Sequence, residues 1–208
     1  MPTTLLIGAA VAATLIGSRR MLRNWGATKA ETHSVFAGDE LVPDPAVTIT
    51  RAVTVEASTD EVWCWLVQIG QGRGGMYSYD WLENLAGLRI HSTEWIRPEL
   101  QTLDIGDEIR LVRPGWLGMR DGYVQRVVAV EPGSALVLMD DNWHSIWSFH
   151  LRALGSNRCR LVSRSRSPQF GNALAVASEI LDPLAFVMTR GMLLGIKRRA
   201  EASSHAVG

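Results

Sequence analysis

The sequence predicts an α+β protein in which a curved antiparallel sheet is covered by one long C-terminal helix. A first strand is followed by two helices, and the middle of the chain then alternates between short strands and turns. A long apolar helical pattern follows the last strand. Strands joined by short turns pair antiparallel, and helices gathered on one face of such a sheet define the α+β class. The space between a bent sheet and its covering helix is a natural ligand pocket.

The composition is that of one globular domain with an appendage. Of the 208 residues, 47% are hydrophobic and 20% are charged, which excludes a disordered chain. The Lys and Arg residues balance the Asp and Glu residues, and no basic block is flanked by aromatic residues, so no nucleic-acid partner is predicted. Cys64 and Cys159 lie far apart in apolar surroundings. We expect two buried, reduced thiols, with a single disulfide as the alternative.

Residues 1–23 are predicted to form an apolar N-terminal helix that anchors the protein in a membrane. Pro2–Ser18 carries no charged side chain and would span roughly 25 Å as a helix, slightly less than a hydrocarbon core of about 30 Å. Three arginines follow this run: Arg19, Arg20 and Arg23. Positive residues beside a span remain cytoplasmic, so we expect a single-pass protein anchored through residues 5–17 with its folded domain in the cytoplasm. A peripheral or packed helix and a cleaved signal peptide are the alternatives.

The folded domain is predicted to begin after a linker, residues 24–46. Val47–Glu56 alternates between apolar and polar residues, which predicts a half-buried strand. Ser58 and Glu61 form a capping-box pattern before an apolar run, which predicts a helix over residues 59–69. Residues 79–86 are predicted to form a second, shorter helix.

Five further strands and a closing helix complete the domain. The strands are predicted over Glu108–Val112, Gly122–Val130, Ala135–Met139, Ser145–Ala153 and Cys159–Ser167. Asp182 is expected to cap a helix over residues 182–202, with Pro183 at its first position and a shorter helical segment before it. The domain therefore extends over residues 47–202, and residues 203–208 form a tail.

Three stretches of the sequence resemble the START-like, or SRPBCC, superfamily. They are Val53–Gly87, with its glycine-rich element GQGRGGMYSYDWLENL, Ile146–Ser167 and Asp182–Glu201. The closer resemblance is to actinobacterial-type members of the polyketide cyclase/dehydrase-like kind, and it covers about residues 46–202. The resemblance implies a helix-grip fold that binds hydrophobic ligands. It implies no particular reaction, because this fold serves carriers, cyclases and hydrolases alike.

Candidate pocket residues come from three parts of the chain. They are Tyr77, Tyr79 and Trp81 beside the glycine-rich loop, Trp147, Phe149 and Leu151 on one strand, and Phe186, Val187, Gly191 and Leu194 on the closing helix. The alternation on the strand predicts an apolar face turned toward the helix. Gly191 and Gly195 keep the helix surface small, either for close packing on the sheet or to leave room for a ligand. For the three aromatic residues beside the loop, an ordinary core role is the alternative.

Two other patterns receive structural interpretations. Gly70–Gly75 follows a helix rather than a strand, so we interpret it as a tight connection, with a mobile gate over the pocket as the alternative. Arg160, Arg164 and Arg166 alternate along the last predicted strand and are expected to form a solvated face, with contact to anionic lipid as the alternative.

No catalytic residue, cofactor or metal site is predicted. The five histidines lack the spacing of metal ligands, and no nucleophile motif is present. His91 lies near Asp80 and Glu83 in the sequence, but we expect a loop role for it. We therefore predict a membrane-tethered binding protein for a small hydrophobic ligand that is a lipid, polyketide-like or aromatic. A cyclase- or dehydratase-type enzyme using the same pocket and a structural protein with a filled core are the alternatives.

Overall fold

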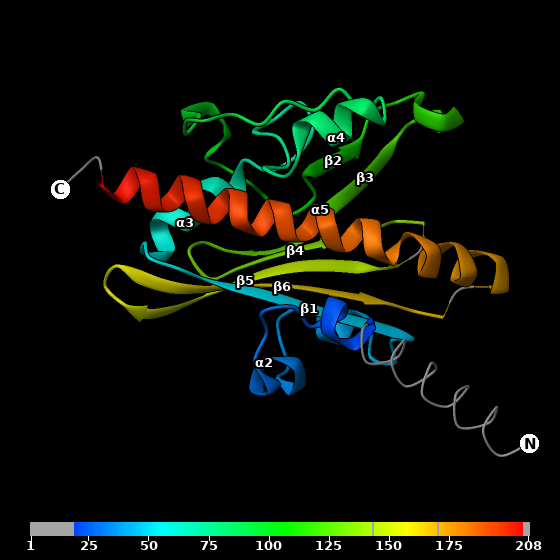
Figure 1. Cartoon of the computed structure of the whole chain (residues 1–208), viewed down its shortest axis with the longest axis horizontal. Coiled ribbons are helices and arrows are strands. Elements are labelled where there is room, and N and C mark those ends of the chain that lie inside the picture. The colour runs from blue at the N-terminus through cyan, green and yellow to red at the C-terminus, as the bar shows by residue number, and fades with distance from the viewer. Residues whose placement is uncertain (1–18, 143, 170, 206–208) are drawn as a thin grey trace, which may run out of the picture.

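The core of the protein is a six-stranded antiparallel sheet. The computed structural model describes residues 19–142, 144–169 and 171–205 (Figure 1). The strands are β1 (Val47–Val55), β2 (Glu108–Val112), β3 (Tyr123–Glu131), β4 (Ala135–Met139), β5 (Ile146–Gly155) and β6 (Arg158–Ser167). They lie in the order β1-β6-β5-β4-β3-β2, with every neighbouring pair antiparallel. This arrangement confirms the predicted α+β sheet.

The helices lie on both sides of this sheet. They are α2 (Lys29–His33), α3 (Thr59–Val67), α4 (Asp80–Leu85) and α5 (Asn172–His205), with short 3₁₀ turns at Asp39–Leu41, Pro98–Leu100 and Trp116–Gly118. The predicted capping box is present at the start of α3, where the Ser58 hydroxyl accepts a hydrogen bond from the Glu61 backbone N–H and the Glu61 carboxylate accepts one from Ser58 N–H. Figure 1 shows α5 extended along one face of the sheet, with α3 beside its C-terminal half.

The closing helix begins earlier than the sequence predicts. α5 starts at Asn172, and Pro183 lies inside it rather than at its first position. The predicted cap at Asp182 is therefore wrong. The Asp182 carboxylate instead accepts a hydrogen bond from Arg23 Nε at 2.8 Å. A proline inside a helix removes one backbone hydrogen bond but does not by itself end the helix.

The hydrophobic core fills the space between the sheet, α3 and the C-terminal half of α5. Alternation along the strands turns Val53, Phe149 and Leu161 toward the helices, as predicted for β5. α5 contributes buried side chains from one face of the helix: Met192, Leu193, Ile196 and Ala200. This part of the interface is tightly filled.

The opposite face of β6 is covered rather than solvated. Arg160 pairs with Glu31 at 2.7 Å, and Arg164 pairs with Asp39 at 2.9 Å. Arg166 also pairs with Asp39, at 3.2 Å. The prediction of a solvated arginine face is therefore wrong. Its partners lie far away in the sequence: Glu31 precedes Arg160 by 129 residues, and Asp39 precedes Arg164 by 125 residues.

That segment, residues 24–46, was predicted to be a linker and contains α2 and the first 3₁₀ turn. Its division from the domain at residue 47 stays a prediction, because packing does not test where an independently folding unit begins. The segment also covers the outer edge of β1, where Ala52 N–H donates to the Trp25 carbonyl at 3.1 Å. A Cβ atom on Gly26, whose φ is +72°, would overlap the Ala52 carbonyl oxygen.

Within the described residues, no helix has both the length and the apolar character needed to cross a membrane. This finding overturns the predicted single-pass membrane localisation. The predicted anchor, residues 5–17, itself lies outside the part of the chain that the structure describes.

Candidate ligand-binding site

A hollow of about 340 Å³ lies between the sheet and the middle of α5. Its apolar walls are formed by Ile49, Ile146, Trp147 and Ala185. Its polar walls include Arg51, Tyr123, Gln125, Ser165 and Thr189. The hollow lies where the sequence predicts a cavity, but the lining is mixed, so the prediction of an apolar cavity is wrong in its chemistry.

Arg51 reaches the hollow because of its place in the period of β1. Side chains alternate along a strand, so Arg51 shares a face with Ile49 and Val53. Ile49 borders the hollow and Val53 belongs to the core. The alternation of apolar and polar residues predicted for this strand counted Arg51 among the polar residues, together with Thr48, Thr50 and Thr54, whereas strict alternation places it inward.

The Arg51 guanidinium is buried and fixed by several contacts. Its Nε donates to the Leu22 carbonyl at 3.1 Å and its Nη1 to the Ala185 carbonyl at 3.3 Å. The Phe186 ring lies 5.3 Å from the guanidinium carbon, a cation–π contact. Burial lowers the pKa of Arg51 to about 10, against the opposing effect of the Asp182 carboxylate. Arg51 is therefore still a cation at neutral pH.

A second polar group borders the hollow on β3. Gln125 Nε2 donates to the Tyr123 hydroxyl at 3.2 Å, and Tyr123 also hydrogen-bonds Asp140. Burial, and secondarily the charge of Asp140, raises the pKa of Tyr123 well above its usual range, so the phenol stays protonated. Gln125 Oε1 is buried and has no hydrogen-bond partner among the described residues.

Of the ten predicted pocket residues, Trp147 borders the hollow and the other nine do not line it. Trp147 Nε1 donates to Ser163 Oγ at 2.9 Å, which fixes the indole ring. Phe149 and Leu151 lie on the same face but are buried in the core, and Leu194 packs against that core. Phe186 contacts Arg51 and Trp25, and Val187 is partly exposed. Ligand contact by these residues stays a prediction.

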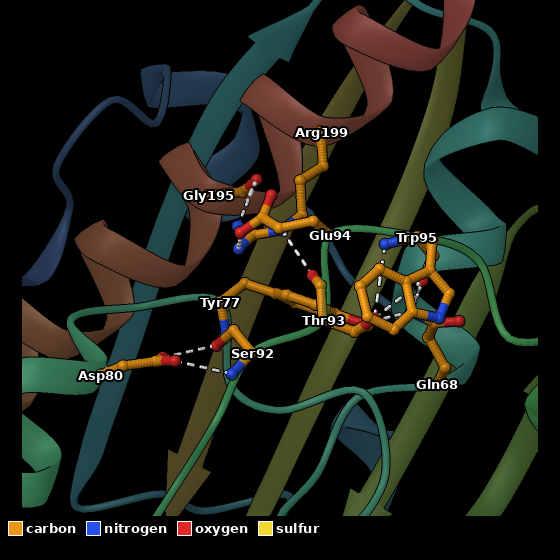
Figure 2. Close-up of polar contacts among 9 residues, drawn as sticks. All are labelled: Gln68, Tyr77, Asp80, Ser92, Thr93, Glu94, Trp95, Gly195 and Arg199. Carbon is orange, nitrogen blue, oxygen red and sulfur yellow. Dashed lines mark hydrogen bonds and ion pairs between the residues drawn. The ribbon is translucent and has the colours of Figure 1, made fainter.

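The glycine-rich loop is docked tightly on α5 through Tyr77 (Figure 2). The Tyr77 hydroxyl accepts a hydrogen bond from Gln68 Nε2 at 2.8 Å, and the Arg199 guanidinium lies 5.0 Å from the tyrosine ring. Arg199 also donates to the Thr93 carbonyl at 2.9 Å and forms an ion pair with Glu94. This network joins the loop to the C-terminal part of α5, in agreement with a structural connection.

The two helix glycines serve this docking rather than the hollow. A Cβ atom on Gly195 would overlap the Tyr77 carbonyl oxygen, and one on Gly191 would lie 2.6 Å from the Tyr79 ring. Close packing is therefore the correct interpretation of these glycines, but against the loop instead of the sheet. Trp81 points away from the interior and is 67% exposed.

The histidines do not gather at a common site. His33, His91 and His144 are exposed, and Asp80 hydrogen-bonds Ser92 rather than its neighbour His91 (Figure 2). His150 is buried on the opposite face of the sheet against Phe36, and burial lowers its pKa to about 4. Cys64 and Cys159 are both free thiols, and Cys64 is only half-buried.

Comparisons with known proteins find similar solved structures at low identity. No family model matches the chain, and no curated protein matches it significantly. One similar solved structure is an aromatase/cyclase from a Streptomyces species, with 17% identity, coverage of 78% of this chain and 98% of that chain, and a TM-score of 0.47. A polyketide cyclase-like protein from Corynebacterium glutamicum is 16% identical, with coverage of 76% of this chain and 94% of that chain, and a TM-score of 0.47. The Aha1 dimer from Colwellia psychrerythraea is 17% identical, with coverage of 74% of this chain and 96% of that chain, and a TM-score of 0.41.

The strand order and the long covering helix α5 are the helix-grip arrangement that the START-like resemblance implies. The resemblance is confirmed for the fold, and the chemistry of the site has to come from its own residues.

Proposed function

We propose that the protein binds a small molecule with an apolar body and polar substituents in the hollow between the sheet and α5. The hollow carries this proposal, because it opens between the sheet and α5 and its volume lies in the range of ligand pockets. Ile49, Ile146 and Trp147 would contact the apolar body. A lipid, polyketide-like or aromatic ligand fits this part of the lining.

Two fluorescent probes test this proposal. N-phenylnaphthylamine is uncharged, whereas anilinonaphthalene sulfonate is its anionic analogue. Both probes become fluorescent in an apolar site. Ala185→Phe places a ring at the rim of the hollow, whereas Ala202→Phe adds the same ring at an exposed position further along α5. We expect a single probe per chain, with about tenfold weaker binding in Ala185→Phe and unchanged binding in Ala202→Phe.

Failure of both probes to bind, or equal affinities in the two variants, would remove the proposed binding function. Native mass spectrometry of protein purified from its own host then identifies the natural ligand through the mass of the co-purifying molecule.

A cyclase- or dehydratase-type enzyme is the second candidate, and one observation favours it. Tyr123 borders the hollow as a protonated phenol that hydrogen-bonds Asp140 and Gln125, and a phenol in this position is a possible proton donor. In an assay that follows cyclisation of a poly-β-ketone by mass spectrometry, Tyr123→Phe should lower turnover by about a hundredfold. Absence of turnover by the unmodified chain would exclude this candidate.

A further inference from the structure

We infer that the molecule bound in this hollow is an organic acid whose anionic group pairs with Arg51. This inference deepens the proposed function and rests on it. Three features of the described residues carry it: the balance of charge beside the hollow, the incomplete hydrogen bonding of Arg51, and the chemistry of the remaining walls.

Two guanidinium groups share one carboxylate at the β1 side of the hollow. Asp182 Oδ2 accepts a hydrogen bond from Arg23 Nε at 2.8 Å, and Asp182 Oδ1 lies 3.8 Å from Arg51 Nη2. The shorter contact goes to Arg23, so the charge of Arg51 is only partly balanced. The Arg51 side chain is 3% exposed, and a buried charge without full compensation destabilises a fold. An anion from the ligand would complete this balance.

Arg51 is also prepared to bind an anion. Its Nε and Nη1 groups are fixed by the Leu22 and Ala185 carbonyls, while Nη2 has no hydrogen-bond partner among the described residues. A guanidinium that is already held in place loses little conformational freedom when it pairs with a carboxylate. The Nη2 atom is itself buried, so an incoming anion has to compete with the long Asp182 contact.

The remaining walls exclude a cationic ligand group. Within the described part of the chain, the lining of the hollow contains Arg51 but no carboxylate. The Ser165 hydroxyl can donate a further hydrogen bond to an anion, and Ile49, Ile146 and Trp147 supply apolar contact. An aromatic or aliphatic acid matches this combination.

The two probes named above test the inference, because they differ only in the sulfonate group. We expect the unmodified chain to bind anilinonaphthalene sulfonate at least about tenfold more tightly than N-phenylnaphthylamine, the scale of a hydrogen bond to a charged group. Arg51→Met should abolish this preference and leave the affinity for the neutral probe within about twofold. Arg198→Met, which removes an exposed arginine of α5 that does not line the hollow, is the matched control and should retain the preference.

Asp182→Asn gives an independent test if Arg51→Met fails to fold. Removal of the competing carboxylate should tighten binding of the sulfonate probe severalfold and leave the neutral probe unaffected. Equal affinities of the unmodified chain for both probes, an intact preference in Arg51→Met, or no tightening in Asp182→Asn would overturn the inference while leaving the binding function in place. Failure of both probes to bind would instead refute the proposed function itself.

Discussion

Replacement of Asp39 by Ala should be the most destabilising change on the face of the sheet opposite α5. Asp39 Oδ1 accepts from Arg164 Nε at 2.9 Å, Asp39 Oδ2 lies 3.2 Å from Arg166 Nη1, and the Phe36 backbone N–H donates to Oδ2 at 3.1 Å. The Asp39 side chain is 4% exposed and that of Arg164 is 5% exposed, so solvent cannot replace the lost partner. Removal of one partner of a buried ion pair costs about 3–5 kcal/mol, and we expect a loss in this range.

Urea unfolding followed by tryptophan fluorescence measures this loss as a change in the free energy of unfolding. Asp39→Asn keeps an acceptor for Phe36 N–H but removes the charge. If the ion pairs dominate, its free energy of unfolding should fall by nearly as much as that of Asp39→Ala. Glu56→Ala breaks the exposed pair with Arg158, whose atoms lie 3.0 Å apart, and should cost much less. An Asp39→Ala loss below about 1 kcal/mol, or an Asp39→Asn variant as stable as the original chain, would refute this reasoning.

Three further predictions concern other parts of the fold. Gly195→Ala should lower the free energy of unfolding by about 1–3 kcal/mol, because the new methyl group displaces the Tyr77 backbone, whereas Gly155→Ala meets open space and should have little effect; thermal unfolding distinguishes the two. The folded pKa of His150, about 4, lies below its unfolded value of 6.5, so folding favours the neutral ring. The free energy of unfolding should therefore include a contribution from His150, on the order of 3 kcal/mol, that is present above pH 6.5 and lost as the pH falls toward 4. In urea titrations at several pH values, a His150→Gln variant should lack this part of the pH dependence. His91 is exposed, so His91→Ala should leave any turnover of a substrate within a few-fold of the original rate; a loss of about a hundredfold would place His91 in an active site.

Local sequence patterns were sufficient to predict most of the fold. β2 and β4 begin and end at the predicted residues, because a short apolar run between turn residues leaves few alternatives. The start of α3 was also predicted, since the Ser58–Glu61 capping box is formed by residues three apart. Patterns of this kind depend only on neighbours in the chain.

The errors arose where distant segments meet. Aspartate is a residue type favoured at helix N-caps, but Asp182 pairs with Arg23 instead, and α5 continues through Pro183. Arg164 was predicted to be solvated because Asp39, its partner, lies 125 residues earlier in the chain. No periodic pattern in the sequence indicates such a pairing.

The candidate site was predicted only in its position. Sheet and helix were expected to enclose a space, and a hollow lies there. The polar chemistry of the hollow was missed because Arg51 was counted among the polar residues of its strand by residue type, instead of being placed on the inward face by the alternation of side chains along the strand. Gly191 and Gly195 were assigned to the pocket or to packing on the sheet, and their actual neighbours, Tyr79 and Tyr77, belong to a loop whose path has no signal in the helix sequence.

The contact between Trp25 and the outer edge of β1 has a consequence for self-association. An uncovered edge strand presents free backbone groups to any other extended chain, and this is a common route to fibrils. The Ala52 N–H is taken by the Trp25 carbonyl, and the neighbouring glycine allows the two backbones to approach. A larger residue at Gly26 would lift this covering segment and leave β1 open to pairing with a second molecule. We therefore expect the residues ahead of the sheet to hinder pairing of β1 with the same strand of a second molecule.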